Sequence, residues 1–163
     1  MFIVKKLFAS LIGAMVFLVS SVCFAETLPD SEVSLGGIPF HSSQDYVRGI
    51  YGEPTKKKVN QSHYWENATE WEYGDSVWMV FQSLGMSAMT VTANNGFSTP
   101  AGAYVGMQEL FIRKLYGAPS YTGPTSKPYD RMYFYRSEQS PRVGIRFDCK
   151  NGRVAKIAIG VFD

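Results

Sequence analysis

Few side chains in this chain of 163 residues could serve as metal ligands, bases or nucleophiles. Its two histidines, His41 and His63, fit no H-x-x-x-H or H-x-H spacing, so a metal site would need a further ligand such as Glu66. The sequence also contains neither a G-x-S-x-G nucleophile motif nor a G-x-x-x-x-G-K-S/T phosphate loop. We therefore expect exposed or turn histidines, no metal and no cofactor.

Cys149 is the remaining candidate for covalent chemistry. The other cysteine, Cys23, lies in an N-terminal segment that we expect to be removed, so no internal disulfide can form. A catalytic thiol would pair with His41 or His63 in an electropositive, partly exposed setting. Cys149 is either a buried free thiol or part of an intermolecular link. Because it ends an apolar strand face, we predict a buried thiol at the edge of the core. A small thiol-dependent enzyme or redox protein that uses Cys149 is the alternative hypothesis.

Carboxylates and aromatic rings are two further features with chemical meaning. Glu70 and Glu72 could suggest the paired acids of glycoside hydrolysis, but residues two apart on a strand project to one side, as on a solvated face.

Aromatic residues make up 15% of the chain, and they crowd at Tyr64-Trp65, Trp71–Tyr73, Trp78 and Met132–Tyr135. These rings either fill the core or form a binding surface, because Trp, Tyr and Arg are common interface anchors.

The N-terminus has the pattern of a secretory signal peptide. Lys5 and Lys6 precede an apolar stretch at residues 7–19, and Cys23-Phe24-Ala25 supplies small residues for cleavage after Ala25. An uncleaved membrane anchor or a lipoprotein modified at Cys23 are the alternatives; Val22 before the cysteine disfavours the second. Residues 1–25 are therefore predicted to be a signal peptide, and the mature protein to be exported, either periplasmic or secreted.

The charge of residues 26–163 excludes one class of partner. Loss of Lys5 and Lys6 leaves 14 basic residues against 14 acidic ones. A chain with a net charge near zero is not expected to bind nucleic acid. Membrane contact is expected only through the transient signal peptide. The run Lys56–Lys58 predicts a solvated edge strand whose charges discourage pairing with other sheets.

A motif that occurs twice indicates the organisation of the mature chain. Residues 37–54 read GIPFHSSQDYVRGIYGEP and residues 102–119 read GAYVGMQELFIRKLYGAP. Such spacing is typical of two copies of one supersecondary unit. We predict a lead-in at 26–36, repeat unit 1 at 37–95, a connector at 96–100 and repeat unit 2 at 101–163.

Each motif predicts a short helix followed by strands. Ser42 is expected to cap the first helix, and Tyr46, Val47, Ile50 and Tyr51 form its apolar face. Met107, Leu110, Phe111, Leu115 and Tyr116 form a similar stripe in the second. Gly52 and Gly117 end the helices, and Pro54 and Pro119 prevent their continuation. Strands are expected at Ser62–Trp65, Thr69–Tyr73, Val77–Gln82, Met89–Ala93, Arg131–Arg136, Val143–Cys149 and Val154–Val161. Asn151-Gly152 predicts a tight turn between the last two of them.

Alternation along these strands assigns their faces. Val143, Ile145, Phe147 and Cys149 share the core face, and Arg142, Arg146 and Asp148 share the other. If the turn at Gly74–Ser76 holds an odd number of residues, Trp71 and Tyr73 join the core, which leaves Trp78 and Val80 on the outer face. Met132 and Phe134 lie outside as well if Tyr133 and Tyr135 point inward.

These elements predict an α+β fold of two similar helix-plus-antiparallel-meander units, with the helices on one face of the sheet. The motif resembles the opening of the β-lactamase-inhibitor-protein-like fold and of the small lipoprotein subunit of the outer-membrane β-barrel assembly machine. The matching residues are Gly37, Ser42, Val47, Ile50, Gly52 and Pro54, and again Gly102, Ile112, Leu115, Gly117 and Pro119. The tandem arrangement is more similar to the inhibitor, which implies a sheet surface that binds a protein. The chain lacks the paired cysteines of the former and the lipoprotein cysteine of the latter.

The function expected from this reasoning is an exported, non-enzymatic binding module. Trp78, Val80, Phe134 and Arg146 would contact a protein partner through an open aromatic sheet face, in envelope assembly or enzyme inhibition. A carrier of a small ligand or lipid, with its cavity between helices and sheet, is a further alternative beside the thiol enzyme.

Overall fold

The computed structural model describes residues 27–60 and 68–162. The predicted signal peptide at 1–25, the predicted strand Ser62–Trp65, and His63 and Glu66 lie outside these residues. The predicted repeat boundaries also stay a prediction. Within the described ranges, no helix is long and apolar enough to cross a membrane.

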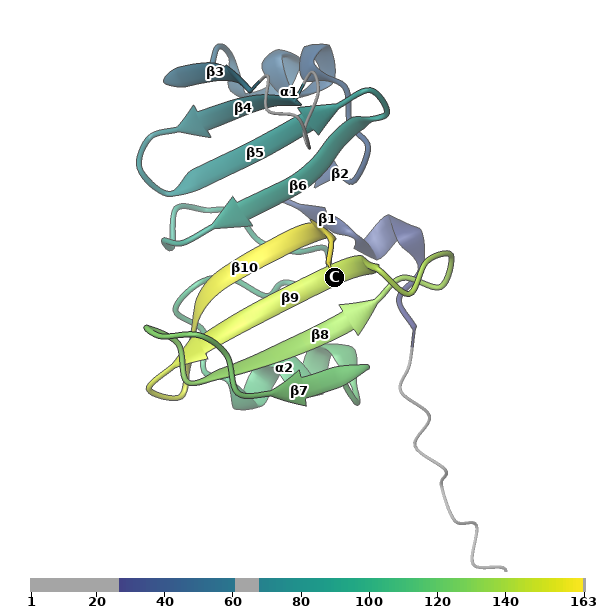
Figure 1. Cartoon of the computed structure of the whole chain (residues 1–163). Coiled ribbons are helices and arrows are strands. Elements are labelled where there is room, and N and C mark those ends of the chain that lie inside the picture. Colours follow the sequence, from purple (N-terminus) through teal and green to yellow (C-terminus); the bar gives the residue numbers. More distant parts are fainter. Residues whose placement is uncertain (1–26, 61–67, 163) are drawn as a thin grey trace, which may run out of the picture.

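One antiparallel sheet of eight strands organises the chain. Its order is β3 (Lys56–Asn60), β4 (Ala68–Tyr73), β5 (Val77–Gln82), β6 (Gly85–Val91), β10 (Arg153–Val161), β9 (Val143–Lys150), β8 (Arg131–Arg136) and β7 (Tyr121–Gly123) (Figure 1). Across the sheet, β3–β6 follow one another in chain order and β10–β7 in reverse chain order, so that β6 and β10 pair in the centre. The lysine-rich segment is the edge strand β3, as predicted.

The central ladder shows that the two halves of the chain share one sheet. Ile157 pairs with Val91, and Gly160 pairs with Ala88. Tight turns set the register on either side: Tyr73 pairs with Val77 across the three-residue turn Gly74–Ser76. At the predicted turn between β9 and β10, Asn151 and Gly152 both adopt positive φ values of 51° and 71°.

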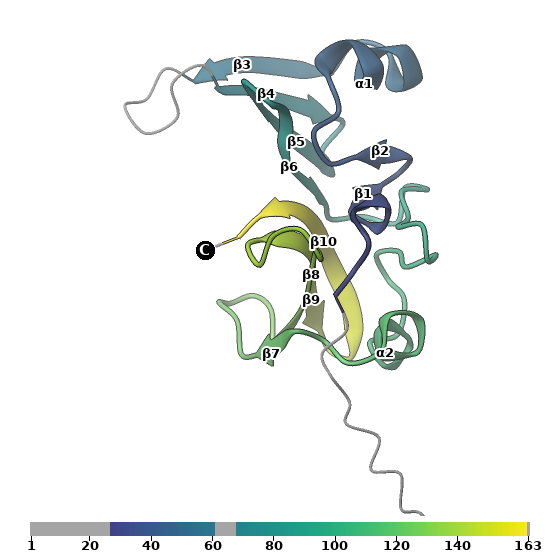
Figure 2. The same cartoon turned by 90° about the vertical axis from the view of Figure 1, so that its right-hand side faces the viewer.

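The remaining elements lie together on one side of this sheet. They are the 3₁₀ turn η1 (Asp30–Glu32), the strand pair β1 (Ser34–Leu35) and β2 (Ile38–Pro39), and the helices α1 (Gln44–Tyr51) and α2 (Leu110–Tyr116) (Figure 2). We call the side of the sheet toward them the inner face and the opposite side the outer face. Figure 1 is viewed from the outer face, which no described helix covers.

The fold class predicted from the sequence is wrong. The part of the chain that the structure describes is mostly β, with ten strands and two α-helices of eight and seven residues, and it is not a pair of helix-plus-meander units. The helices are too short to form a layer of their own. Each ends after two turns, where Gly52 and Gly117 adopt φ values of 74° and 71°. These two helix ends are confirmed.

The helix faces differ from the predicted ones as well. Ser43 caps α1 by accepting a hydrogen bond from the Tyr46 amide at 3.1 Å, whereas Ser42 donates to the carbonyl of Pro39. In α1 only Val47 is buried, and in α2 only Ile112 and Tyr116 are buried. A two-turn helix can bury one or two positions per turn, so the broader apolar stripes stay at the surface. Exposed members are Tyr46, Ile50, Tyr51, Leu110, Phe111 and Leu115.

The core lies between the inner face and these elements. Its largest fully buried side chains include Trp71, Phe81, Tyr135 and Phe147. Tyrosines on the sheet also satisfy the helix ends: the Tyr73 hydroxyl donates to the carbonyl of Gly52 at 2.9 Å, and that of Tyr135 to Gly117 at 3.2 Å. These bonds fasten each helix end to a sheet strand.

Candidate functional site

Three of the four predicted contact residues lie in one row across the outer face. Trp78 on β5 pairs with Thr90 on β6, and Thr90 pairs in turn with Ala158 on β10. Ala158 pairs with Arg146 on β9, and Arg146 pairs with Phe134 on β8. Four strand spacings separate Trp78 from Phe134, which is about 19 Å. The sheet therefore positions Arg146 and Phe134 together and Trp78 at a distance.

The two β5 residues differ in how much surface they offer. The Trp78 side chain is 37% exposed and stands beside Glu72 on β4. Val80 faces the same side, but only 7% of it is exposed. Trp78 can therefore contact a partner directly, and Val80 offers little contact area.

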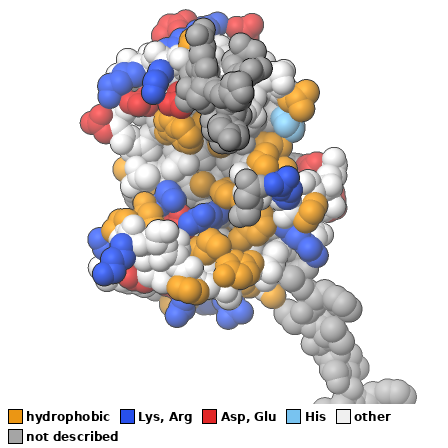
Figure 3. Space-filling view, viewed as in Figure 1, with side chains coloured by type: hydrophobic (Ala, Val, Ile, Leu, Met, Phe, Trp, Pro, Cys, Tyr) orange, Lys and Arg blue, Asp and Glu red, His pale blue; other side chains and the backbone are white. Residues whose placement is uncertain are grey.

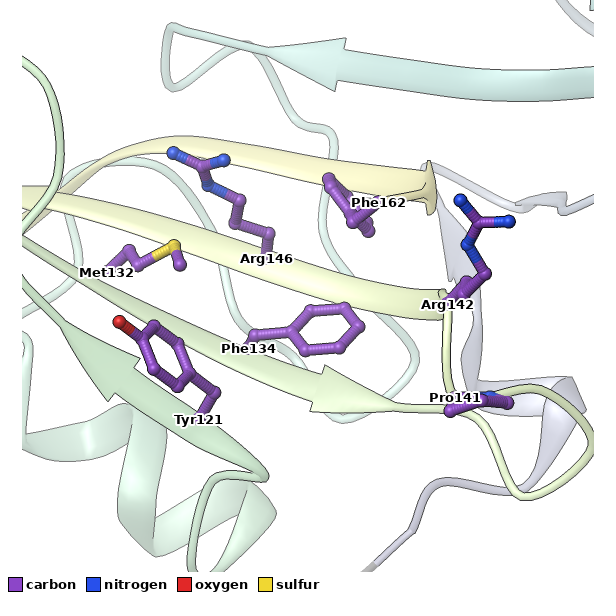
Figure 4. A pocket seen from close by; sticks show the side chains of 7 residues that line it. All are labelled: Tyr121, Met132, Phe134, Pro141, Arg142, Arg146 and Phe162. Carbon is purple, nitrogen blue, oxygen red and sulfur yellow. The ribbon is translucent and has the colours of Figure 1, made fainter.

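A groove of about 620 Å³ opens on the outer face around Phe134. Tyr121 on β7, Met132 and Phe134 on β8, Arg146 on β9, and Pro141, Arg142 and Phe162 line it (Figure 4). The rings of Phe134 and Phe162 meet edge to face with their centroids 5.3 Å apart. In the space-filling view, hydrophobic side chains gather over this half of the sheet, with Lys and Arg side chains among them (Figure 3).

Two glycines leave space on the outer face beside Phe134, because they carry no side chain. Gly144 on β9 and Gly160 on β10 pair with each other across the strands. A Cβ at Gly144 would lie 2.1 Å from the carbonyl oxygen of Tyr135 and 2.9 Å from Cε2 of Phe134. The ring of Phe134 can occupy this position only because residue 144 has no side chain.

A buried carboxylate holds the cations of the site in place. Asp148 on β9 is fully buried, and its Oδ1 lies 2.8 Å from Nη2 of Arg146 while its Oδ2 lies 2.6 Å from Nζ of Lys156. Nη2 of Arg146 also donates to Oγ1 of Thr125 at 3.0 Å, and Nζ of Lys156 lies 4.8 Å from the Tyr129 ring centre. One negative charge thus fixes two positive ones, which leaves the cluster with an excess positive charge.

Cys149, the candidate nucleophile, lies on the inner face and is 1% exposed. Burial raises the pKa of its thiol to about 12, and the carboxylates of Glu109 and Asp148 act in the same direction. A thiolate is therefore scarce at neutral pH, which opposes nucleophilic use. The predicted buried thiol is confirmed.

We expect Cys149 to react with a thiol reagent only when the chain unfolds. At pH 8 the native protein should react with an aromatic disulfide reagent at least about a hundredfold more slowly than the protein in denaturant, because reaction needs both access and ionisation. Absorbance of the released thiolate gives both rates. Rapid reaction of the native protein at pH 7–8 would contradict a buried, protonated thiol.

The other candidate groups do not converge. His41 is exposed, with a φ of 66° and its ring against Phe40. Glu72 binds Lys56 at 3.1 Å on the outer face, as expected of a solvated strand face. Among the described residues, no group of three or more His, Cys, Asp or Glu is placed to hold a metal ion.

Sequence reasoning missed several residues of the groove. Tyr121 belongs to the three-residue strand β7, which carries no alternation long enough to detect. Phe162 follows the last strand, and its amide donates to the carbonyl of Arg142 at 2.7 Å. Asp148 shares the outer face with Arg146, as the alternation predicts, and the i, i+2 spacing of these opposite charges was the signal for their ion pair.

No protein-family model matches the sequence, and no curated protein matches it. One similar solved structure is an extracellular protein containing a SCP domain from Bacillus anthracis str. Ames, with 12% sequence identity and a TM-score of 0.51. The alignment covers 99% of this chain and 50% of that one, so this chain spans about half its length. At this identity the likeness concerns the fold alone.

A second similar structure is a DUF4309 family protein from Bacillus subtilis subsp. subtilis str. 168. It is 12% identical, with a TM-score of 0.43, and the match covers 77% of this chain and 88% of that one. Neither structure is described as belonging to the inhibitor-like or lipoprotein-like folds that the helix motif resembles. That resemblance stays a prediction.

Proposed function

We propose that the protein is an exported, non-enzymatic binding module that contacts a protein partner through its outer face. The observation that carries this proposal is the groove of about 620 Å³, in which aromatic rings and an anchored guanidinium lie side by side. Aromatic and arginine side chains are the usual anchors of protein interfaces. Phe134 and Arg146 would supply the main contacts, and Trp78 a second one on the same row.

Two further observations support export and binding over the alternatives. The N-terminal segment has signal-peptide character, and the Bacillus anthracis structure of similar fold is described as extracellular. The groove lies on the outer face rather than between helices and sheet, where a carrier would hold its ligand. The raised pKa of Cys149 argues against the thiol enzyme.

A capture experiment with matched phenylalanine variants tests this function. Residues 26–163 serve as bait in envelope extract and culture supernatant, captured proteins are identified by mass spectrometry, and the affinity of each purified candidate is measured by calorimetry. Phe134→Ala should weaken binding at least about tenfold, as expected for an interface anchor. Phe111→Ala is the control, because Phe111 is 39% exposed on α2, on the opposite side of the sheet.

The function is refuted if no candidate binds the purified protein, or if Phe134→Ala and Phe111→Ala bind alike. If a partner is found, its affinity for the Trp78→Ala variant shows whether the contact extends as far as β5. Weakened binding by Trp78→Ala, with unchanged thermal unfolding, would place the partner across the whole row from β5 to β8.

A further inference from the structure

We propose that the groove binds an extended segment of the protein partner in which a carboxylate side chain stands beside an aromatic one. This inference rests on the proposed function, because it names the partner chemistry that the same surface fits. It follows from the distribution of charge between the two halves of the chain and from the arrangement of the groove.

The near-neutral charge of the chain hides a strong asymmetry. Residues 27–100 contain four Lys and Arg against eight Asp and Glu, whereas residues 101–163 contain ten against five. Every residue that lines the groove comes from the second, basic half. A partner segment at this surface must therefore be anionic to be attracted rather than repelled.

Two acidic side chains of the basic half are already paired with cations. Glu109 pairs with Arg131 at 3.0 Å, and the fully buried Asp148 is shared between Arg146 and Lys156. The outer face also presents Arg136, which is exposed and pairs with Gly144 in the β8–β9 ladder. The charged side chains that line the groove itself are Arg142 and Arg146, and both are positive.

Arg146 is placed to receive a carboxylate. Its Nε and Nη2 atoms are occupied by Asp148 and Thr125, and its Nη1 atom has no partner among residues 27–60 and 68–162. Because the buried carboxylate already fixes the guanidinium, little side-chain entropy would be lost on binding. A charge-assisted hydrogen bond to Nη1 would therefore favour a carboxylate over an amide.

The rings beside Arg146 are placed to receive an aromatic side chain. Tyr121 is 52% exposed and is the cross-strand neighbour of Phe134, whose ring in turn meets that of Phe162 edge to face (Figure 4). Phe134 and Arg146 are direct cross-strand neighbours. In an extended segment, residues i and i+2 project to one side at a spacing of about 7 Å. An aromatic residue and an acidic residue two positions apart can thus reach both subsites together.

Binding of short peptides to the mature protein tests this inference. The probe is an acetylated and amidated peptide in which glutamate, phenylalanine and glutamate alternate with serines. Its matched controls replace the glutamates by glutamine, or the phenylalanine by alanine. We expect the acidic aromatic peptide to bind about tenfold more tightly than either control in low salt, measured by NMR titration, and to weaken as ionic strength rises.

Variants of single cations locate the site of the carboxylate. Arg146→Gln should abolish the preference for glutamate over glutamine, and Arg146→Lys should retain part of it. Lys114→Gln removes the same charge from the exposed surface of α2 and should leave the preference unchanged. Since Arg146→Gln also weakens the neutralisation of Asp148, each variant is first checked by thermal unfolding. The comparison of the two peptides on the native protein does not depend on any variant.

The outcomes separate this inference from the proposed function. The acidic segment is overturned if the glutamate and glutamine peptides bind equally, or if Arg146→Gln keeps the native preference for glutamate. A captured partner would still support the proposed function in either case. Equal binding of the phenylalanine and alanine peptides also overturns the inference, because attraction would then be a general response to negative charge. Anionic vesicles and an oligonucleotide serve as further probes; binding of either more tightly than the peptide would assign the basic surface to a membrane or a nucleic acid instead.

Discussion

Replacement of Trp71 by alanine should lower the free energy of unfolding by about 3–5 kcal/mol, whereas the same replacement at Trp78 should lower it by about 1 kcal/mol or less. Trp71 is fully buried on the inner face, with its ring 4.8 Å from that of Phe81. The Arg48 guanidinium also lies 5.4 Å from its ring centre. Removal of the indole would leave a cavity that the rigid sheet beneath it cannot close. Trp78 stands on the outer face and is 37% exposed.

Urea unfolding followed by far-ultraviolet circular dichroism measures both effects without relying on tryptophan fluorescence. Trp71→Phe serves as a partial replacement and should recover a large part of the loss, because an aromatic ring still fills the cavity. Equal destabilisation by the two alanine variants would show that Trp78 belongs to a core. It would then no longer be available as a contact residue.

The second large effect is expected at Gly144, where a methyl group has no room. Gly144→Ala should destabilise the protein by about 3 kcal/mol, because the new Cβ would lie 2.1 Å from the backbone oxygen of Tyr135. The change also displaces the Phe134 ring, whose Cε2 lies 2.9 Å from the same point. Any folded fraction of this variant should therefore bind the partner less well.

Gly49→Ala is the matched control for this substitution. Gly49 lies within α1, and a Cβ there meets no atom within 4 Å. Alanine is the better helix former by about 1 kcal/mol, so this variant should be as stable as the native protein or more stable. Thermal unfolding compares the stability of both variants with that of the native protein. A Gly144→Ala variant that melts within a few degrees of the native protein would disprove the clash.

Local signals in the sequence were reliable where Gly or Asn adopts a positive φ, whereas the predicted helix cap Ser42 was wrong by one residue. Gly52 and Gly117 ended the helices, and Asn151-Gly152 formed the turn between β9 and β10. Strict alternation placed Val143–Cys149 correctly, because one face of that strand is buried and a slip of one residue would expose it. For the same reason Trp78 and Phe134 were placed on the outer face, as the ladders confirm.

The predicted fold class was wrong because local sequence patterns do not show how much of the core each helix or strand contributes. The apolar stripes of the helices predicted a helix layer, but the helices stop after two turns and bury three residues between them. The joining of β6 to β10 depends on pairing between residues such as Val91 and Ile157, far apart in the chain. The groove could not be predicted for the same reason. Tyr121 and Phe162 lie beside Phe134 because of tertiary contacts, which no sequence motif indicates.

The position of β10 has a consequence for the time order of folding. It is central in the sheet, yet it follows all of its neighbours in the chain. While the polypeptide is being synthesised or delivered across a membrane, β3–β6 can pair among themselves, but β6 keeps an open edge until β10 arrives. Unsatisfied edges of this kind pair readily with other chains, and late, long-range pairing is slow. The interval before β10 pairs is therefore the stage at which the nascent protein most needs protection from aggregation.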